Sequence, residues 1–470
     1  MMDGEVLHVN HESGVAVHRP GRGASTIPRL RPADRGSVPR IGSRHDWNRL
    51  LSWSLSLVVL VFVGRVQEVL PGLSNLPLGN IAVLLSLIGL IQLGYLRDAG
   101  RIVSTTQGRT MVSFVGIAAF TVPFALWPGG AFLSFVALLK TSVLFVLIVI
   151  AVRRPKHLMQ LTLVFAVAVA ILASAYVVDW LIGGGSLTEQ DLVAFDRNDV
   201  ALLAVMGIPF ALAITVRRRA WTWVGFALAG YLSLAVVATD SRGGFLALLA
   251  TGLVMIVHGR FLSPAKKTTL IAVGVVALMI GGSSEYWDRI EAVFTSPSSD
   301  YNFSSTDGRI EIWKRGVGYF LDDPITGVGI GNFPIAEGET FKDADKGFKH
   351  WSAAHSAYIL VAAELGIGGL VLYLALLWGI WRQGARTERI ARRIRAGPSR
   401  ELAAIAEATR YSTVGFVIGA AFLSVTYSVS FVFLVATGVS LGLLGAEQRV
   451  LRPSGRALSP ERNGNGARHR

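Results

Sequence analysis

The sequence lacks several features that would point to common kinds of enzyme. It contains no cysteine, which excludes disulfide bonds and thiolate metal sites. It has neither the HExxH pattern of zinc proteases nor the glycine pattern of a P-loop. We therefore expect no metal and no nucleotide cofactor. A short apolar core near the start is also missing, so we expect no cleaved signal peptide.

Charge is scarce as well, and apolar residues dominate instead. Charged residues make up 16% of the chain and hydrophobic residues 52%, and the mean hydropathy is +0.50. A soluble protein of this size would need a more polar surface. Many apolar runs reach the roughly 20 residues that a helix needs to cross a bilayer, and runs this continuous indicate helices rather than barrel strands. The predicted fold class is all-α, a polytopic helical bundle in a membrane.

Hydropathy windows predict about twelve spans. The expected cores are Leu50–Gly64, Leu78–Leu96, Met111–Trp127, Ala131–Val152, Leu158–Ile182, Val200–Val216, Trp221–Thr239, Gly244–His258, Thr268–Gly282, Ala357–Trp381, Val414–Thr426 and Val429–Leu444.

The charges of the connecting segments support an even number of spans. With a cytoplasmic N-terminus, the segments expected inside are basic, and those expected outside are neutral, acidic or mixed. Residues 1–48 and 446–470 are basic tails that we expect to be disordered and cytoplasmic. The membrane domain then covers residues 49–445, with one large extracytoplasmic loop at 283–354. This topology explains the net charge of +14, so no nucleic-acid partner is expected.

Two patterns stand out inside the large loop. A helix is expected from about Asp307 to Leu321, capped by Ser305 or Thr306. The apolar spacing predicts that its buried face consists of Ile310, Trp313, Val317, Phe320 and Leu321. The run Gly327 to Gly331, GVGIG, predicts a tight turn, which we call the glycine turn.

Two arginines on the predicted outer side call for a physical reason. Arg242 lies in the turn TDSRGG, and Arg197 lies in FDRND just before an apolar run. Anchoring at the membrane surface would account for Arg242, and a local ion pair with Asp196 or Asp199 would account for Arg197. The functional interpretation is that each arginine faces a cavity and binds an anionic group. A guanidinium suits phosphate oxygens because it donates in a bidentate fork and stays charged.

His355 opens the predicted helix that re-enters the membrane, and Tyr358 follows one turn later. His355 is either an interfacial anchor or a general base that also orients an acceptor, because a neutral imidazole accepts protons near neutral pH. Glu364 lies in an apolar run, where a carboxylate is costly unless it is paired or faces water, so we expect it in a buried polar network. Lys140 is likewise a charged residue inside a predicted span. Snorkelling of its ammonium group to the membrane surface would account for it.

Four motifs together make the chain resemble the O-antigen ligase/polymerase superfamily of bacterial envelope glycan enzymes. They are RNDVALL at 197–203, SRGGFLALL at 241–249, GRIEIWKRGVGYFLDDPITGVGIGNF at 308–333 and HSAYILVAAELGIGG at 355–369. Their order and placement are similar to the family over roughly residues 50–445. The family usually has His-Asn where this chain has His355-Ser356, so a polar side chain is kept there without the amide.

The resemblance implies a fold like that of the large membrane glycosyltransferases that use lipid-linked sugars, the GT-C type. It implies a metal-independent glycosyltransferase in the bacterial cytoplasmic membrane, whose donor is a glycan on undecaprenyl pyrophosphate. An acceptor hydroxyl on a glycan or glycolipid would attack the anomeric carbon, and the lipid pyrophosphate would leave. On this basis Arg242 and His355 are the expected catalytic residues. The expected substrate-binding residues are Arg197, Arg309, Lys314, Tyr358 and Glu364.

Rival functions remain compatible with the same sequence. Arg309 and Lys314 could simply form the solvated face of the loop helix. A transporter or flippase of the lipid-linked glycan would also have about twelve spans, although the halves of the chain show no internal repeat and the long outer loop is asymmetric. A protein O-oligosaccharyltransferase would share the fold and the donor. The sequence identifies neither the sugar nor the acceptor, and it does not separate a ligase from a polymerase.

Overall fold

The computed structural model describes residues 46–70, 72–73, 75–182, 196–281, 308–340, 351–394 and 397–450. These residues form helices and their connections, and no strand occurs among them. The longer helices are α1 (Arg49–Phe62), α3 (Leu78–Gln92), α5 (Thr106–Thr121), α6 (Pro128–Ala151), α7 (Pro155–Ile182), α8 (Arg197–Ala213), α9 (Arg219–Ala238), α10 (Arg242–His258), α11 (Pro264–Gly281), α14 (Arg309–Asp322), α15 (Phe333–Thr340), α16 (Ala357–Ile394), α17 (Gly397–Gly419) and α18 (Val429–Val450). The short ones are α2 (Val66–Val69), η1 (Tyr95–Asp98), α4 (Arg101–Ser104), η2 (Val122–Phe124) and η3 (Ile214–Val216). The predicted all-helical class is confirmed for this part of the chain.

Six of these helices are long and apolar enough to cross a membrane. They are α6, α7, α8 together with η3, α9, α16 and α18. A seventh crossing is added if α3 and the short helices after it form one span, which would be bent by 91°. The helices α1 and α10 are apolar but shorter, with 14 and 17 residues. A helical membrane protein is thereby supported, whereas about twelve spans stays a prediction.

Several predicted segments lie outside the described residues. These are nearly all of the N-terminal tail, the C-terminal tail beyond residue 450, residues 283–307 and 341–350 of the outer loop, and with them the two candidate caps Ser305 and Thr306. The assignment of the tails and the membrane domain is therefore still an expectation.

Two predicted spans have the wrong boundaries. The span expected at Leu78–Leu96 stops early, because Gly94 takes a left-handed φ of 69° and the chain bends there. The span expected at Val414–Thr426 is displaced, because α17 ends at Gly419. The arginine-rich segment before α17, which we expected to be a loop, is helical in its described part. Its charges are compatible with a helix because acidic and basic side chains one turn apart pair with each other.

The outer-loop helix is present as α14, but its buried face is not the predicted one. Ile312 and Gly316 are buried, whereas Val317 and Leu321 are 43% and 66% exposed. A Cβ atom on Gly316 would lie 2.4 Å from the side chain of Ile359 in α16. Close approach of the two helices therefore depends on a residue without a side chain, which a hydropathy pattern does not register.

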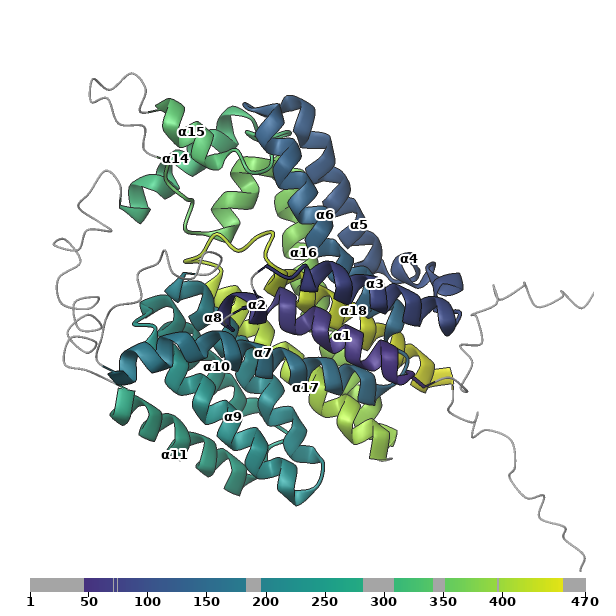
Figure 1. Ribbon diagram of the computed structural model, residues 1–470. Helices are drawn as coiled ribbons and strands as arrows, with labels where there is room; N and C mark the ends of the chain where they lie inside the picture. The colour runs from purple at the N-terminus through teal and green to yellow at the C-terminus, as the bar shows by residue number, and fades with distance from the viewer. Residues whose placement is uncertain are drawn as a thin grey trace, which may run out of the picture. The chain divides into compact units, whose positions relative to one another are not determined.

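The central helices of the packing are α16 and α8. Helix α16 contacts α5, α14, α17 and α18, and α8 contacts α7, α9, α10 and α17 (Figure 1). The outer-loop helices α14 and α15 both pack on α16. Helix α8 is the most enclosed of the candidate spans, with 89% of its apolar window buried. Because α10 also packs on α17, the helices α8, α10 and α16 share one partner.

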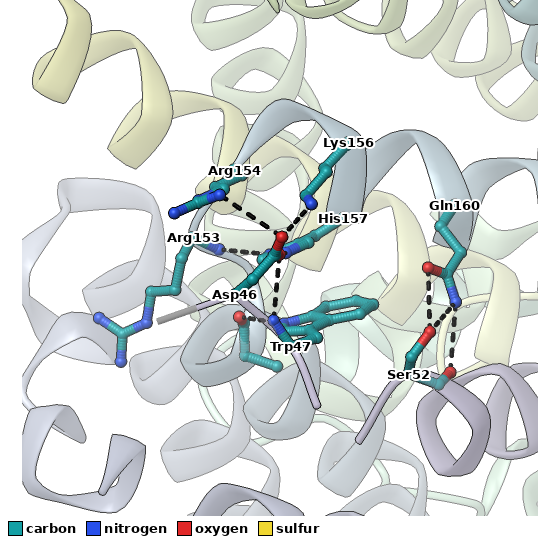
Figure 2. A network of polar contacts seen from close by, with 9 residues as sticks. Asp46, Trp47, Ser52, Arg153, Arg154, Lys156, His157 and Gln160 are labelled. Carbon is teal, nitrogen blue, oxygen red and sulfur yellow. Dashed lines mark hydrogen bonds and ion pairs between the residues drawn. The ribbon is translucent and has the colours of Figure 1, made fainter. Parts of the chain in front are cut away.

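A polar network fastens the start of α1 to the start of α7 (Figure 2). The Asp46 carboxylate lies 2.6 Å from His157 Nε2, 3.4 Å from Arg154 Nη1, and also pairs with Lys156. The Trp47 ring stacks on the His157 ring at 4.2 Å, and its Nε1 donates to a carbonyl at the end of α6 (2.8 Å). Burial acts to raise the pKa of Asp46, but the bonds from Lys156 and His157 outweigh it and lower the pKa to about 2.

Candidate active site

The glycine turn locks into a break in α16. Gly366 has φ 63° and ψ −164°, which interrupts the helix there. The carbonyl of Ala363 accepts a hydrogen bond from the N–H of Val328 (2.8 Å), and the carbonyl of Glu364 accepts one from the N–H of Gly329 (3.1 Å). The carbonyls that the break leaves without helical partners are thus satisfied by the glycine turn, as backbone groups in a membrane protein must be.

The fit of the glycine turn leaves no room for side chains. A Cβ atom on Gly329 would lie 2.2 Å from the Cβ of Ala125, and the φ of Gly329 is +92°. On the other side of the break, the N–H of Ile367 donates to the carbonyl of Pro324 (2.8 Å). The outer-loop motif and the motif that opens α16 therefore form one interlocked unit.

Glu364 is buried inside this unit, with 1% of its surface exposed. Its Oε1 accepts a hydrogen bond from the N–H of Phe333 (3.0 Å). Tyr427 lies beside the carboxylate and interacts with it, but within the described residues neither its hydroxyl nor Glu364 Oε2 has the geometry of a hydrogen bond. A buried polar oxygen without a partner costs about 1–3 kcal/mol, so its retention requires a reason.

The unpartnered oxygen belongs to a residue that lines a cavity of about 340 Å³. Ala353 and Ala354, directly before His355, line the same cavity. A second cavity of about 530 Å³ is lined by Lys140 and Asp199, among others. The residues that line both cavities are Ala137, Thr141, Ser424 and Tyr427. The two hollows therefore adjoin along α6 and along the connection between α17 and α18.

The connection between α17 and α18, residues 420–428, positions His355. The N–H of His355 donates to Ser424 Oγ (2.9 Å). Two residues later the N–H of Ala357 donates to the carbonyl of Ala420 (2.8 Å), while its own carbonyl accepts a bond from Thr426 Oγ1 (2.9 Å). The backbone at the start of α16 is thereby fixed from outside the helix.

Three non-glycine residues among those described have a positive φ, and each lies in or beside a candidate site. They are Arg65 with φ 46°, Asp240 with φ 52° and His355 with φ 47°. Arg65 lines the larger cavity, and Asp240 stands two residues before Arg242. A left-handed backbone costs roughly 1–2 kcal/mol in a non-glycine residue, and such costs cluster at functional sites.

The first turns of α8 and α10 are joined directly, which brings Arg197 and Arg242 to neighbouring positions. Ser241 caps α10, and its Oγ donates to Asn198 Oδ1 of α8 (2.7 Å). Arg197 and Arg242 are the first residues of their helices, and both are half-buried. The positive helix N-termini add to the attraction that the guanidinium groups exert on an anion.

The local ion pair that would have accounted for Arg197 is not found among the described residues. The Asp196 side chain instead caps α8 by accepting a bond from the N–H of Asp199 (2.8 Å). The position of Arg242 follows from its neighbour Gly243. A Cβ atom on Gly243 would lie 3.4 Å from Phe422 of the α17–α18 connection. The start of α10 therefore lies against the same connection that positions His355.

His355 shares its surroundings with charged groups from α8 and α14. Its side chain is half-buried, and burial together with the positive charge of Arg309 lowers the pKa of His355, against the opposing effect of Asp196. A lowered pKa keeps the imidazole neutral at neutral pH, the form in which it can accept a proton. Arg309 and the α8 N-terminus are therefore close enough to influence the same ring.

The remaining predicted site residues differ in their placement. The Tyr358 hydroxyl donates to the carbonyl of Val417 in α17 (2.7 Å), so it holds two helices together. Lys314 is exposed and pairs with Glu311 one turn away (2.6 Å), which agrees with a solvated helix face. Arg309 acts on the His355 ring, and Arg197 and Arg242 begin helices that the Ser241–Asn198 bond joins, whereas Glu364 lines the cavity that Ala353 and Ala354 also line.

Sequence reasoning missed the residues of the α17–α18 connection. Ser424, Thr426 and Tyr427 were assigned to a span and to a short outer loop. Ser424 and Thr426 in fact hold the His355 segment, and Ser424 and Tyr427 line both cavities. The polar run SVTYSVS interrupts an apolar stretch, and that interruption was the available signal. Within the described residues no cluster of three or more His, Asp or Glu side chains is suited to a metal ion, so metal independence stays a prediction.

A comparison with known families supports the resemblance for part of the chain. Residues 227–374 match the family described as O-Antigen ligase. The matched region contains the motifs around Arg242, the glycine turn and His355, and it leaves out the motif around Arg197. None of the curated proteins matches the chain. The resemblance seen in the sequence is confirmed for this region, and it supports a membrane protein that acts in glycan transfer.

Proposed function

Because residues 227–374 match the O-antigen ligase family, we propose that the protein is a membrane glycosyltransferase that takes its glycan from undecaprenyl pyrophosphate. The acceptor is a hydroxyl group of a second glycan or glycolipid at the outer face of the bacterial cytoplasmic membrane. The proposal includes the predicted topology: about twelve spans of GT-C type, both termini in the cytoplasm, and the loop at 283–354 outside.

One observation supports this proposal most strongly. The two arginines that begin α8 and α10 are neighbours through the Ser241–Asn198 hydrogen bond, and His355 is held on the connection against which Gly243 also packs. A group suited to phosphate oxygens and a group suited to a hydroxyl proton are thereby brought to the same end of the helices. A pyrophosphate leaving group and a hydroxyl nucleophile need those two groups.

In the proposed reaction the acceptor oxygen forms a bond to the anomeric carbon while the bond from that carbon to the pyrophosphate oxygen breaks. His355 takes the proton of the acceptor hydroxyl. Arg242 and Arg197 stabilise the negative charge that develops on the departing lipid pyrophosphate, which is worth about 10²–10³ in rate for one well-placed donor. A positioned base contributes a further factor of about 10²–10⁴.

The lowered pKa of His355 gives this reaction an expected pH dependence. A base with its ordinary pKa, near 6.5, would already be half protonated at that pH. Since burial and Arg309 lower the pKa of His355, we expect transfer to persist below pH 6.5 and to fall only at more acidic pH. A rate that already drops by half near pH 6.5 or above would argue against His355 as the base.

The test is a transfer assay with the purified full chain in lipid nanodiscs. The donor is an undecaprenyl-pyrophosphate oligosaccharide, and the acceptors include a second copy of the same donor, a lipid-linked core glycan and a peptide. We expect Arg242→Ala and His355→Ala each to lower transfer at least a hundredfold, as removal of a well-placed donor or base does. The matched controls are Arg219→Ala, which alters another helix-opening arginine that is exposed, and His258→Ala, which alters an exposed histidine.

The outcomes separate the possible functions. Transfer to the second donor molecule identifies a polymerase, transfer to the core glycan a ligase, and transfer to the peptide a protein oligosaccharyltransferase. Full activity in folded Arg242→Ala and His355→Ala would refute the site. Movement of the lipid-linked glycan across vesicles without any transfer would favour a flippase.

A further inference from the structure

A basic pocket lies at the opposite end of α10 from Arg242. Helix α10 has 17 residues, so its ends are about 25 Å apart at 1.5 Å per residue. Just beyond its last residue, Arg260 lines a pocket of about 320 Å³ together with Arg392 of α16 and Arg400 of α17. The rest of the lining is mostly apolar and includes Phe261 and Ala404. The proposed transfer reaction uses none of these residues.

The acids near the pocket are already engaged, mainly by Arg392 and Arg410. The buried Glu407 pairs with Arg392 and accepts bonds from the Tyr411 hydroxyl (2.7 Å) and the N–H of Arg260. The buried Glu388 is shared by Arg392 and Arg410, at 2.8 Å from each.

The cations at the pocket mouth are left in excess. Arg260 is 69% exposed and reaches Glu388 only at 3.9 Å. Arg400 is exposed and takes part in none of the ion pairs among the described residues, since its neighbour Glu401 pairs with Arg217. Lys266 of α11 lies near enough to Arg400 for the two positive charges to repel each other. Repelling cations beside a hollow are stabilised by an anion placed between them.

We propose that this pocket binds the phosphate group of an anionic ligand, held by Arg400 and Arg260 with Lys266 beside them. Guanidinium groups match phosphate oxygens in a bidentate geometry, and a phosphate between them removes the repulsion with Lys266. The apolar wall formed by residues such as Phe261 and Ala404 suits the first carbons of an acyl chain, so a phospholipid headgroup is one source of the phosphate. Basic pockets between membrane helices bind such headgroups. A soluble phosphate is the other source.

The test measures binding by the full chain and does not depend on glycan transfer. Detergent-purified protein is examined by native mass spectrometry with phosphatidylglycerol and with phosphatidylcholine. Thermal unfolding is followed in inorganic phosphate and in chloride of equal ionic strength. The variant is Arg260→Gln/Arg400→Gln, in which both substituted side chains are exposed. The matched control is Arg393→Gln. Arg393 is an exposed arginine of α16, next to Arg392, and does not line the pocket.

We expect the wild type and the control to retain phosphatidylglycerol over phosphatidylcholine, and the double variant to bind it at least tenfold more weakly. Inorganic phosphate could instead raise the unfolding temperature of the wild type and the control, but not of the double variant, and displace phosphatidylglycerol. That result would identify a soluble phosphate as the ligand and support the pocket. Equal binding of both probes by the wild type and the double variant would overturn the proposal. Failure of the wild type to bind either probe would overturn it as well.

Discussion

The two ends of α16 each bury a carboxylate network, and the networks differ in how completely they are paired. Near the end of α16, Glu388 and the α17 residue Glu407 meet Arg392, Arg410 and the Tyr411 hydroxyl. Near its start, Glu364 accepts a bond from one backbone N–H, and its second oxygen has no hydrogen bond within the described part of the chain. Both carboxylates of the Glu407 network are paired with arginines, whereas Glu364 has one oxygen without a hydrogen bond beside a cavity.

This difference separates a structural use of buried charge from a functional one. Carboxylates that are paired with arginines stabilise the contact between α16 and α17 and offer a ligand no free acceptor. An unpartnered oxygen beside a cavity of about 340 Å³ costs stability until a ligand donates to it. We therefore expect substitutions in the two regions to have different consequences, stability in one and transfer in the other.

The largest effect on stability is expected for Glu407→Gln. The substitution removes the charge that compensates Arg392 in a buried position, where breaking an ion pair costs about 3–5 kcal/mol. Thermal and denaturant unfolding in detergent would measure the loss. The comparison fails if Glu407→Gln is as stable as the wild type.

A smaller but substantial loss is expected for Gly329→Ala, which tests the interlock that holds Glu364. The new methyl group meets Ala125 at 2.2 Å, and the residue must keep a φ of +92°. Overpacking and left-handed backbone together predict a loss of about 2–4 kcal/mol in the free energy of unfolding, read from denaturant unfolding in detergent. The matched control is Gly318→Ala in α14, where a Cβ meets nothing within 4 Å. There we expect a gain of up to about 1 kcal/mol from higher helix propensity, and an equal loss at both glycines would contradict the interlock.

Glu364→Gln should change function more than stability. The amide keeps an oxygen that can accept the Phe333 N–H, so the free energy of unfolding should change by less than about 1 kcal/mol. A ligand group that donates to the carboxylate would lose a charge-assisted bond of about 1.5–3 kcal/mol, which lowers transfer tenfold or more. The nanodisc transfer assay measures this directly. If transfer is unchanged and stability is lost, the role of Glu364 is structural, as we expect for Glu407.

The smallest effect is expected for Asp46, whose charged partners are drawn in Figure 2 and whose side chain is 39% exposed. The pKa of Asp46 is about 2 in the folded protein, below its ordinary value of 3.8. Its stabilising contribution is therefore complete above pH 3.8 and is lost as the pH falls towards 2. Asp46→Asn should lower the unfolding temperature slightly at neutral pH and approach the wild type as the pH falls below about 2. Asp322→Asn, at the exposed end of α14, is the control.

The sequence predicted the local features of this molecule better than the contacts between distant segments. The apolar runs located α6, α7 and α9 within a few residues, because burial in an apolar phase needs a continuous run. The glycine turn was predicted from its composition alone. Arg197, Arg242 and His355 were singled out as polar residues at the ends of apolar runs, and in the structure Arg197 and Arg242 begin helices that the Ser241–Asn198 bond joins.

What the sequence could not show depends on pairing between segments. Hydropathy places Val317 on a buried face, but the actual face is set by the contact of Gly316 with Ile359. Likewise, nothing local in Ser424 indicates that it holds the backbone of His355. These contacts join residues far apart in the chain, and a single sequence carries no record of such pairs.

The break at Gly366 also determines the order in which this protein can be assembled. The carbonyls of Ala363 and Glu364 find their donors in Val328 and Gly329, in a segment that precedes α16 and is expected outside the membrane. Until that segment has been translocated and docked, the start of α16 carries open carbonyls in an apolar phase, at several kcal/mol each. We therefore expect biogenesis to end with the docking of the glycine turn. A newly inserted chain would have its helices in place before it has the cavity beside Glu364.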